Sequence, residues 1–385
     1  NYILAAVPLF VFMGCMLERA GIAERLFEAL YLWTRRLPGG LAVGAVLLGV
    51  IFAAASGVVG ATETVIGLLA IPIMMKYGYN KSLIAGTICA GGSLGTVIPP
   101  SVLVVILAPI ADVSVGDLFA GLLFPGLLMA VLFVLYIVIR CALNPALAPR
   151  EMADKGPEVP LLTMIRMTVF AVLPPLFLIF TVLGTILMGL ATTTEAAACG
   201  AVGATLLTLM NRRLSIQVLG DAAQKTVRIT VMMLTILLAG SMFAGVFIAS
   251  GGVGDVRALL DAANLTPWHT LLLILFIAFI SGFALDLVSV VLVMIPISMP
   301  IITSLDFDPV WFCILFLVMI QTSYLTPPMA PAIFYLRAIS PPEITLADMY
   351  RGVIPFIGLQ LLTLVLILIF PQIALYLPSQ ITGFR

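Results

Sequence analysis

Apolar segments long enough to cross a membrane follow one another along this chain, and they exclude a water-soluble fold. A helix needs about 20 apolar residues to cross the hydrocarbon core of a bilayer. Charged residues make up 9% of the chain, against roughly 25% in soluble domains. The sequence therefore predicts an all-α, multi-pass membrane protein. We expect crossing segments at 1–17, 81–111, 118–140, 161–181, 186–210, 224–250, 309–338 and 348–379.

The few polar residues exclude several classes of function. The 18 Lys and Arg residues balance 18 Asp and Glu residues, so no basic surface exists that could neutralise a nucleic-acid backbone. His269 is the only histidine, which excludes two-histidine zinc motifs, and no Ser-His-Asp set stands out around it. It follows Thr266-Pro267, a helix N-cap and first-turn proline, so we interpret it as an interfacial residue. No catalytic constellation is present, and we predict that the protein is not an enzyme.

Two apolar stretches are interrupted by a Ser-Gly pair, and two others by a Pro-Pro pair. The stretches 41–75 and 266–303 contain Ser-Gly, which fits either two full spans or a re-entrant hairpin. The short first arm of 41–75 favours the hairpin. The segments 81–111 and 309–338 contain Pro-Pro, and we expect each to be one broken helix.

The hairpin interpretation gives a consistent charge distribution across the membrane. All Lys and Arg residues except Arg257 and Arg385 then lie in loops on one face, which is cytoplasmic by the positive-inside rule. Two full spans in place of each hairpin would leave most of these residues on the same face, so charge alone does not decide. We also predict amphipathic interfacial helices at 22–36 and 253–263.

The two halves of the chain resemble each other. Pro99-Pro100 matches Pro327-Pro328, 228 residues later, and Asp117 and Gly121 match Asp348 and Gly352. An odd number of crossings separates matched segments, which predicts inverted repeats at 1–165 and 166–385, as in secondary transporters. The first half lacks a counterpart of the 186–210 segment, so we expect roughly 50 further residues, about one span and the start of another, before Asn1.

The paired prolines provide the chemistry for ion binding. Proline has no N–H, so Pro99 and Pro100 leave the carbonyls of Gly95 and Thr96 without helical partners. By the same reasoning, Pro327 and Pro328 free the carbonyls of Ser323 and Tyr324. Such carbonyls, with nearby Ser and Thr hydroxyls, could hold Na⁺, and the adjoining helix N-termini suit an anionic substrate. The alternative is a kinked helix whose carbonyls are satisfied by neighbouring side chains.

Three acidic residues lie in apolar surroundings. Asp286 follows the Ser281-Gly282 pair, and a carboxylate at membrane depth indicates function unless it lies at a hydrated hairpin mouth. Glu63 follows Ser56-Gly57 and fits either a functional role or a polar contact within its helix. Glu195 fits a capping box with Thr192 as the N-cap, and we favour this structural interpretation.

At these motifs the sequence resembles the large membrane subunit (DctM-like) of tripartite ATP-independent periplasmic (TRAP) transporters. The resemblance covers essentially the whole chain. Its most specific parts are the stretch from Gly92 through Pro99-Pro100-Ser101 and the Ala-Thr-Thr-Thr-Glu segment that ends at Glu195. The remaining matching stretches are Met13–Leu26, Gly189–Gly200 and Leu325–Pro328.

The resemblance implies a sodium-coupled, elevator-type importer of organic acids, a carboxylate or sulfonate, in the bacterial inner membrane. It also implies two partners: a periplasmic substrate-binding protein and a small four-helix membrane subunit. The hairpins and broken helices would form the moving transport domain, and the other helices the scaffold. The first Na⁺ site would involve Ser56, Gly57, Ser93, Gly95 and Val97. The second would involve Ser281, Gly282, Asp286, Thr322 and Thr326, and the substrate would contact Ser56, Ser93, Ser281 and Thr326.

Two other functions fit the same sequence. A stand-alone sodium/dicarboxylate symporter of similar fold would need no binding protein, and neighbouring genes for a binding protein and a small subunit would argue against it. An ion channel would conduct without a sodium gradient.

Overall fold

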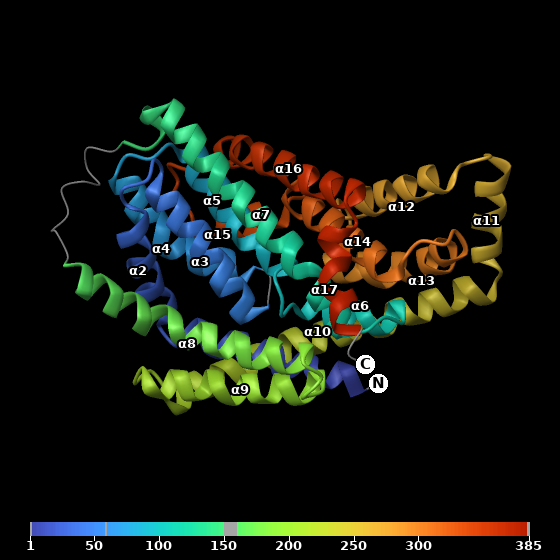
Figure 1. Cartoon of the computed structure of the whole chain (residues 1–385), viewed down its shortest axis with the longest axis horizontal. Coiled ribbons are helices and arrows are strands. Elements are labelled where there is room, and N and C mark those ends of the chain that lie inside the picture. Colours follow the sequence, from blue (N-terminus) through green and yellow to red (C-terminus); the bar gives the residue numbers. More distant parts are fainter. Residues whose placement is uncertain (1, 58–59, 150–159, 383–385) are drawn as a thin grey trace.

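The computed structural model describes residues 2–57, 60–149 and 160–382, and every regular element in those ranges is helical (Figure 1). This confirms the all-α prediction. The chain begins with a short 3₁₀ turn, η1 (Tyr2–Ala5), followed by α1 (Ala6–Arg19) and α2 (Ile22–Thr34). The two α-helices meet at an angle of 66°. Gly21 joins them with φ +65°, a conformation that favours glycine.

Each predicted hairpin consists of two helices that pack against each other. The first contains α3 (Gly40–Ser56) and α4 (Ala61–Lys76), and the second contains α12 (Pro267–Ser281) and α13 (Leu287–Ser304). Both first arms end at the serine of the Ser-Gly pair, as the sequence predicts. Glycine follows as the C-cap residue, where the helix must stop.

Each predicted broken helix is interrupted at its Pro-Pro pair. The first consists of α5 (Lys81–Ser93), the 3₁₀ turn η2 (Leu94–Thr96) and α6 (Val102–Ala111). The second consists of α14 (Pro309–Leu325) and α15 (Pro331–Ile339). Proline at these positions removes the hydrogen bond that would continue the helix, so the chain turns before the next helical half begins.

One of the other predicted crossing segments is interrupted in the structure. The segment predicted at 348–379 is two helices, because Phe370-Pro371 ends the first of them. Within the described residues, six helices are long and apolar enough to cross a membrane, α13 of the second hairpin among them, or up to seven if α1 and α2 form one bent span. The elements outside the hairpins, the broken helices and the α1–α2 pair are α7 (Val115–Leu143), η3 (Pro145–Leu147), α8 (Leu161–Leu187), α9 (Thr193–Met210), α10 (Ile216–Ala249), α11 (Gly252–Ala262), α16 (Leu346–Ile369) and α17 (Gln372–Thr382).

The order of elements recurs along the chain, and so do their contacts. The series α1 to α7 has the same order of long, short, hairpin and broken helices as the series α10 to α16. Gly86 of α5 packs against the backbone of Gly352 in α16, so closely that a Cβ at Gly86 would overlap the Gly352 carbonyl oxygen. The positions that match this pair, Ile314 and Gly121, are also in contact. Contacts between α4 and α15 likewise correspond to contacts between α13 and α6.

The core lies where the hairpins meet the broken helices. The arms α5 and α14 are almost entirely buried, whereas α8, α9 and α10 expose large apolar side chains. Phe170, Phe177 and Phe180 of α8 are each more than 70% exposed. In Figure 1, α8 and α9 form the lower edge of the molecule. Exposed apolar helices of this length are suited to contact with lipid or with another membrane subunit.

Candidate transport site at the two hairpin tips

The first hairpin tip docks onto the Pro-Pro break of the first broken helix. Gly57 has φ +61°, and its N–H donates to the carbonyl of Ala53 at 2.9 Å, which closes α3. The Gly57 carbonyl accepts the N–H of Val102 at 3.2 Å, the first residue of α6. A Cβ at Gly57 would lie 2.7 Å from the carbonyl oxygen of Pro100. Glycine is therefore required at this position both by its backbone angle and by the close approach of the break.

Hydroxyl oxygens gather beside this tip. Ser56 Oγ lies 3.3 Å from Thr62 Oγ1, and both side chains are at most 1% exposed. Gly95 faces the same place, since a Cβ there would lie 3.9 Å from Thr62 Oγ1. The structure thus brings together Ser56, Gly57 and Gly95, as predicted for the first site. It also adds Thr62, which the sequence analysis did not identify. Its hydroxyl could have been noticed from the sequence, because Thr62 lies close after the Ser-Gly pair at the hairpin tip.

Ser93 and Val97, also predicted for the first site, lie nearby but differ in orientation. Val97 is buried, and its N–H donates to the Leu94 carbonyl at 3.1 Å. The Ser93 hydroxyl donates to the Ala90 carbonyl at 2.8 Å and accepts hydrogen bonds from the side-chain amides of Gln321 and Gln360, each at 3.3 Å. Its hydroxyl therefore points into the contact between α5, α14 and α16.

The second hairpin tip contacts the second broken helix in a similar way. Gly282 packs so closely against the side chain of Ser323 that a Cβ at Gly282 would overlap it. Ser281, at the end of α12, is half-buried beside this contact. One detail corrects the sequence prediction: the Ser323 carbonyl accepts the N–H of Thr326 at 3.0 Å and is not left without a partner. A turn at the break supplies the bond that the missing proline N–H cannot.

Two further hydroxyls predicted for the second site lie on the same segment. Thr322 is fully buried, and its hydroxyl donates to the Val318 carbonyl at 2.9 Å. Thr326 is half-buried at the end of α14, and its hydroxyl donates to the Thr322 carbonyl at 2.6 Å. A hydroxyl that donates one hydrogen bond keeps its oxygen lone pairs, so both can still act as ligands of a cation.

Asp286 is the N-cap of α13 and is exposed. Its carboxylate accepts the backbone N–H groups of Val288 and Ser289 at 3.1 and 3.4 Å and the hydroxyl of Ser289. This exposure fits the hairpin mouth, one of the two positions weighed from the sequence. The sequence carried a signal for this role, because aspartate directly before an apolar helical segment is strongly preferred as the N-cap.

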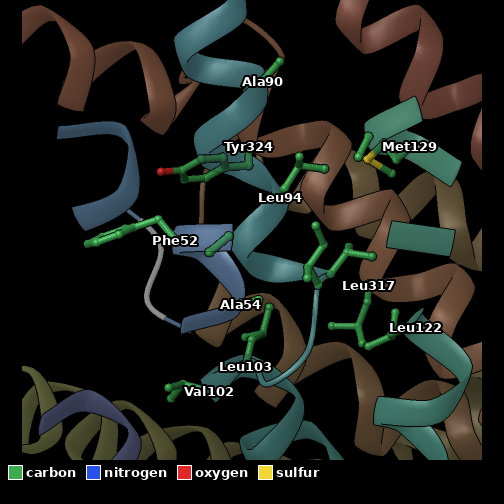
Figure 2. Packing of buried hydrophobic residues seen from close by; sticks show 14 of the residues in the cluster. Phe52, Ala54, Ala90, Leu94, Val102, Leu103, Leu122, Met129, Leu317 and Tyr324 are labelled. Carbon is green, nitrogen blue, oxygen red and sulfur yellow. The ribbon is translucent and has the colours of Figure 1, made fainter. Parts of the chain in front are cut away.

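Glu63 occupies the matching part of the first hairpin but is fully buried. Its carboxylate accepts the N–H of Gly60 at 2.8 Å and forms a capping box at the start of α4. Gly92 of α5 packs against its side chain, and Tyr324 of α14 lies beside it. Figure 2 shows Tyr324 among the buried side chains around the break of the first broken helix. Glu63 therefore touches both broken helices.

Two helix caps predicted away from the tips are confirmed. Thr192 caps α9, and Glu195 completes the capping box through its 2.8 Å bond from the Thr192 N–H. Thr266 caps α12, and His269 is an exposed residue in the first turn of that helix. Neither contributes an atom to the tips.

The sequence matches the family model "Tripartite ATP-independent periplasmic transporter, DctM component" over residues 1–373. A C4-dicarboxylate TRAP transporter large permease protein from Pseudomonas aeruginosa is 30% identical over 98% of this chain and 87% of the relative. An ectoine/5-hydroxyectoine TRAP transporter large permease protein from Ruegeria pomeroyi is 30% identical over 97% of this chain and 85% of the relative. A sialic acid TRAP transporter permease protein from Haemophilus influenzae is 26% identical over 98% of this chain and 60% of the relative.

A solved structure shows a similar fold. The YdaH transporter of Alcanivorax borkumensis superimposes with a TM-score of 0.64, covering 96% of this chain and 86% of that chain, at 16% identity. The relatives are transporter subunits and not enzymes, and this family lies in the inner membrane. Because the family model covers nearly all of the sequence, this chain belongs to the DctM component family of TRAP transporters.

Proposed function

We propose that this chain is the large membrane subunit of a sodium-coupled importer of organic acids that works by an elevator mechanism. The observation that carries the proposal is the packing of each Ser-Gly hairpin tip against its own broken helix, the first at Pro100 and Val102 and the second at Ser323. Two independent parts of the chain make this contact, 228 residues apart between the matching prolines. A kink that served only local packing would not require a hairpin tip at both positions.

Sodium fits the chemistry of both tips. The groups at hand are hydroxyl and carbonyl oxygens, the hard ligands that small, hard cations prefer. The first site would use Ser56, Thr62 and the backbone oxygens near Gly95, and the second would use Ser281, Thr322 and Thr326. Asp286 would balance charge at the second site from the start of α13.

The substrate would lie between the two tips, near Ser56, Ser281 and Thr326. The relatives are named for C4-dicarboxylates, ectoines and sialic acid. Each of these solutes carries a carboxylate, so we propose a small carboxylate-bearing solute here. The helices α6 and α15 begin at the two breaks, and their N-terminal dipoles would favour its negative charge.

The elevator mechanism divides the chain into a moving part and a static part. Both hairpins and both broken helices would move as the transport domain, and the remaining helices would form the scaffold. The corresponding contacts of Gly86 with Gly352 and of Gly121 with Ile314 support two repeats of one structural unit, inverted in the membrane. The exposed apolar faces of α8, α9 and α10 would contact lipid and the small membrane subunit, and a periplasmic binding protein would deliver the solute.

Uptake in proteoliposomes tests this proposal. The chain would be reconstituted with a small subunit and a binding protein from its own organism, and a panel of radiolabelled organic acids would be offered with and without an inward Na⁺ gradient. We expect uptake of a carboxylate that requires both the gradient and the binding protein. Sodium-driven uptake without the binding protein would favour the stand-alone symporter, and current without a gradient would favour a channel.

A further inference from the structure

A buried polar cluster lies where the two broken helices cross, and the proposed ion sites do not use it. It consists of Ser93 on α5, Gln321 on α14, Gln360 on α16 and Met129 on α7, all of them fully buried or nearly so. The Gln321 amide nitrogen lies 3.3 Å from both Ser93 Oγ and Met129 Sδ. The Gln360 amide nitrogen lies 3.3 Å from the same serine oxygen. Figure 2 shows Met129 among the buried apolar side chains of the core, which also include Leu94 and Leu317.

The cluster follows the internal repeat. Ser93 and Gln321 are 228 residues apart, the spacing of the two Pro-Pro pairs. Met129 and Gln360 are 231 residues apart, the spacing that relates Gly121 to Gly352. The contact from Gln360 to Ser93 therefore corresponds to the contact from Gln321 to Met129. Ser93 and its repeat counterpart Gln321 contact each other directly, so the cluster joins matching positions of the two broken helices.

The hydrogen bonding of the cluster is incomplete in a specific way. The side-chain oxygens of Gln321 and Gln360 are buried and accept no hydrogen bond within the described part of the chain. Ser93 donates its single hydroxyl proton to the Ala90 carbonyl instead. A buried amide oxygen without a donor is costly, and an apolar side chain of similar volume would avoid that cost. The Ser93 hydroxyl proton therefore has two kinds of acceptor, the Ala90 carbonyl of its own helix and the side-chain amide oxygen of a glutamine on another helix.

We infer that this cluster couples the two sodium sites, with Gln321 and Gln360 as positioning residues. Ser93 precedes Gly95 of the first site by two residues, and Gln321 directly precedes Thr322 of the second. When an ion draws the backbone of one break toward it, Ser93 or Gln321 moves and the hydrogen bond between them changes partner. A packed contact with two discrete arrangements transmits such a shift, so occupation of one site changes the affinity of the other. This inference rests on the proposed sodium-coupled function.

The test measures the cooperativity of sodium activation. Gln360→Met installs the residue already present at the matching position, Met129, and Gln321→Leu removes both contacts of its amide. The wild type should give a Hill coefficient for sodium of about two, and each variant should lower it to about one. The double variant should lose no more than either single one, because both amides act through the Ser93 hydroxyl. Thr363→Val serves as the control, since Thr363 is buried one turn further along α16 and its hydroxyl bonds only to the Leu359 carbonyl.

Sodium-dependent thermal stabilisation of the purified chain provides a second readout that needs neither partner nor transport. We expect the sodium titration of the melting temperature to lose its sigmoidal shape in both variants and to keep it in Thr363→Val. Variants that retain a wild-type Hill coefficient would overturn the inference, as would a wild type whose sodium dependence is hyperbolic, and either result leaves the sodium-coupled function intact. Uptake by the wild type without sodium would instead refute the proposed function and the inference with it.

Discussion

The two hairpin tips have matching architecture but very different exposure. At the first tip, Ser56 and Glu63 are at most 1% exposed. At the second, Asp286 is exposed, and Met329, which directly follows the second Pro-Pro pair, is 46% exposed. The oxygen atoms at the first tip are therefore enclosed, whereas those at the second range from the buried Thr322 hydroxyl through the half-buried Ser281 and Thr326 to the exposed Asp286 carboxylate. The two tips therefore differ in how far their side chains are buried, although their elements follow the same order.

The helices that precede the hairpins show the same contrast. Gly14 of α1 touches the first tip, and a Cβ there would lie 2.5 Å from the Ser56 carbonyl oxygen. Gly245, its counterpart in α10, has no atom within 4 Å of the position a Cβ would take. The first tip is thus packed between α1 and the broken helix, whereas the matching glycine of α10 makes no such contact with the second tip. Substitution of these two glycines is the most direct test of the difference between the two tips.

We expect the largest effect from Gly14→Ala. The added methyl group must displace the backbone at Ser56, and overpacking of this kind costs about 1–3 kcal/mol. Transport should be lost, because the displaced carbonyl lies at the proposed first ion site. Gly245→Ala should leave transport intact and raise the melting temperature slightly, since alanine favours the helix. Melting of the detergent-solubilised variants and uptake in proteoliposomes measure both effects, and equal effects of the two substitutions would refute the asymmetry.

Thr62→Val should have the next largest effect. Valine fills the same volume but removes the hydroxyl that lies 3.3 Å from Ser56 Oγ. The half-saturating sodium concentration should rise by about tenfold, the loss of roughly 1.4 kcal/mol of binding free energy. Thr64→Val is the matched control, because the Thr64 hydroxyl donates to the Gly60 carbonyl on the same helix. A sodium dependence that changes equally in both variants would remove Thr62 from the site.

Asp286→Asn should have a smaller effect, confined to sodium. Asparagine caps helices about as well as aspartate, so α13 and the stability of the chain should be preserved. The lost charge should raise the half-saturating sodium concentration several-fold, and the exposure of Asp286 limits the effect because water screens its field. The shift should shrink at high ionic strength set with choline chloride. An unchanged half-saturation and maximal rate would identify Asp286 as a helix cap alone.

The sequence predicted the elements of this site better than their contacts. The Ser-Gly and Pro-Pro pairs located both hairpins and both breaks, because serine, glycine and proline act on the local backbone. The direction of Ser93 could not be predicted in this way. In a helix that is apolar on every side, hydrophobic periodicity does not identify the face that meets a neighbour. Only the packing of α5 against α14 and α16 places Gln321 and Gln360 on its hydroxyl.

Local hydrogen bonding explains the remaining differences. The Ser323 carbonyl was predicted to lack a partner from the helical pattern alone, but the chain turns at the break and brings the Thr326 N–H to it. The Phe370-Pro371 interruption lies in an apolar segment whose length suggested one helix, and proline ended it. The role of Asp286 as a cap was readable from its sequence, but its exposure depends on how far the second hairpin projects.

We expect the smallest effects from two matched helix caps, one in each half of the chain. Their loss should change the stability of the two halves by similar amounts. Ser114 caps α7 by accepting the Asp117 N–H at 3.3 Å, and Thr345 caps α16 by accepting the Asp348 N–H at 3.2 Å. Loss of an N-cap hydroxyl typically costs about 1 kcal/mol. Ser114→Ala and Thr345→Ala should therefore lower the melting temperature by similar amounts and leave the half-saturating sodium concentration unchanged. A large sodium effect in either variant would show that the difference between the halves extends beyond the hairpin tips into the helices that follow the breaks.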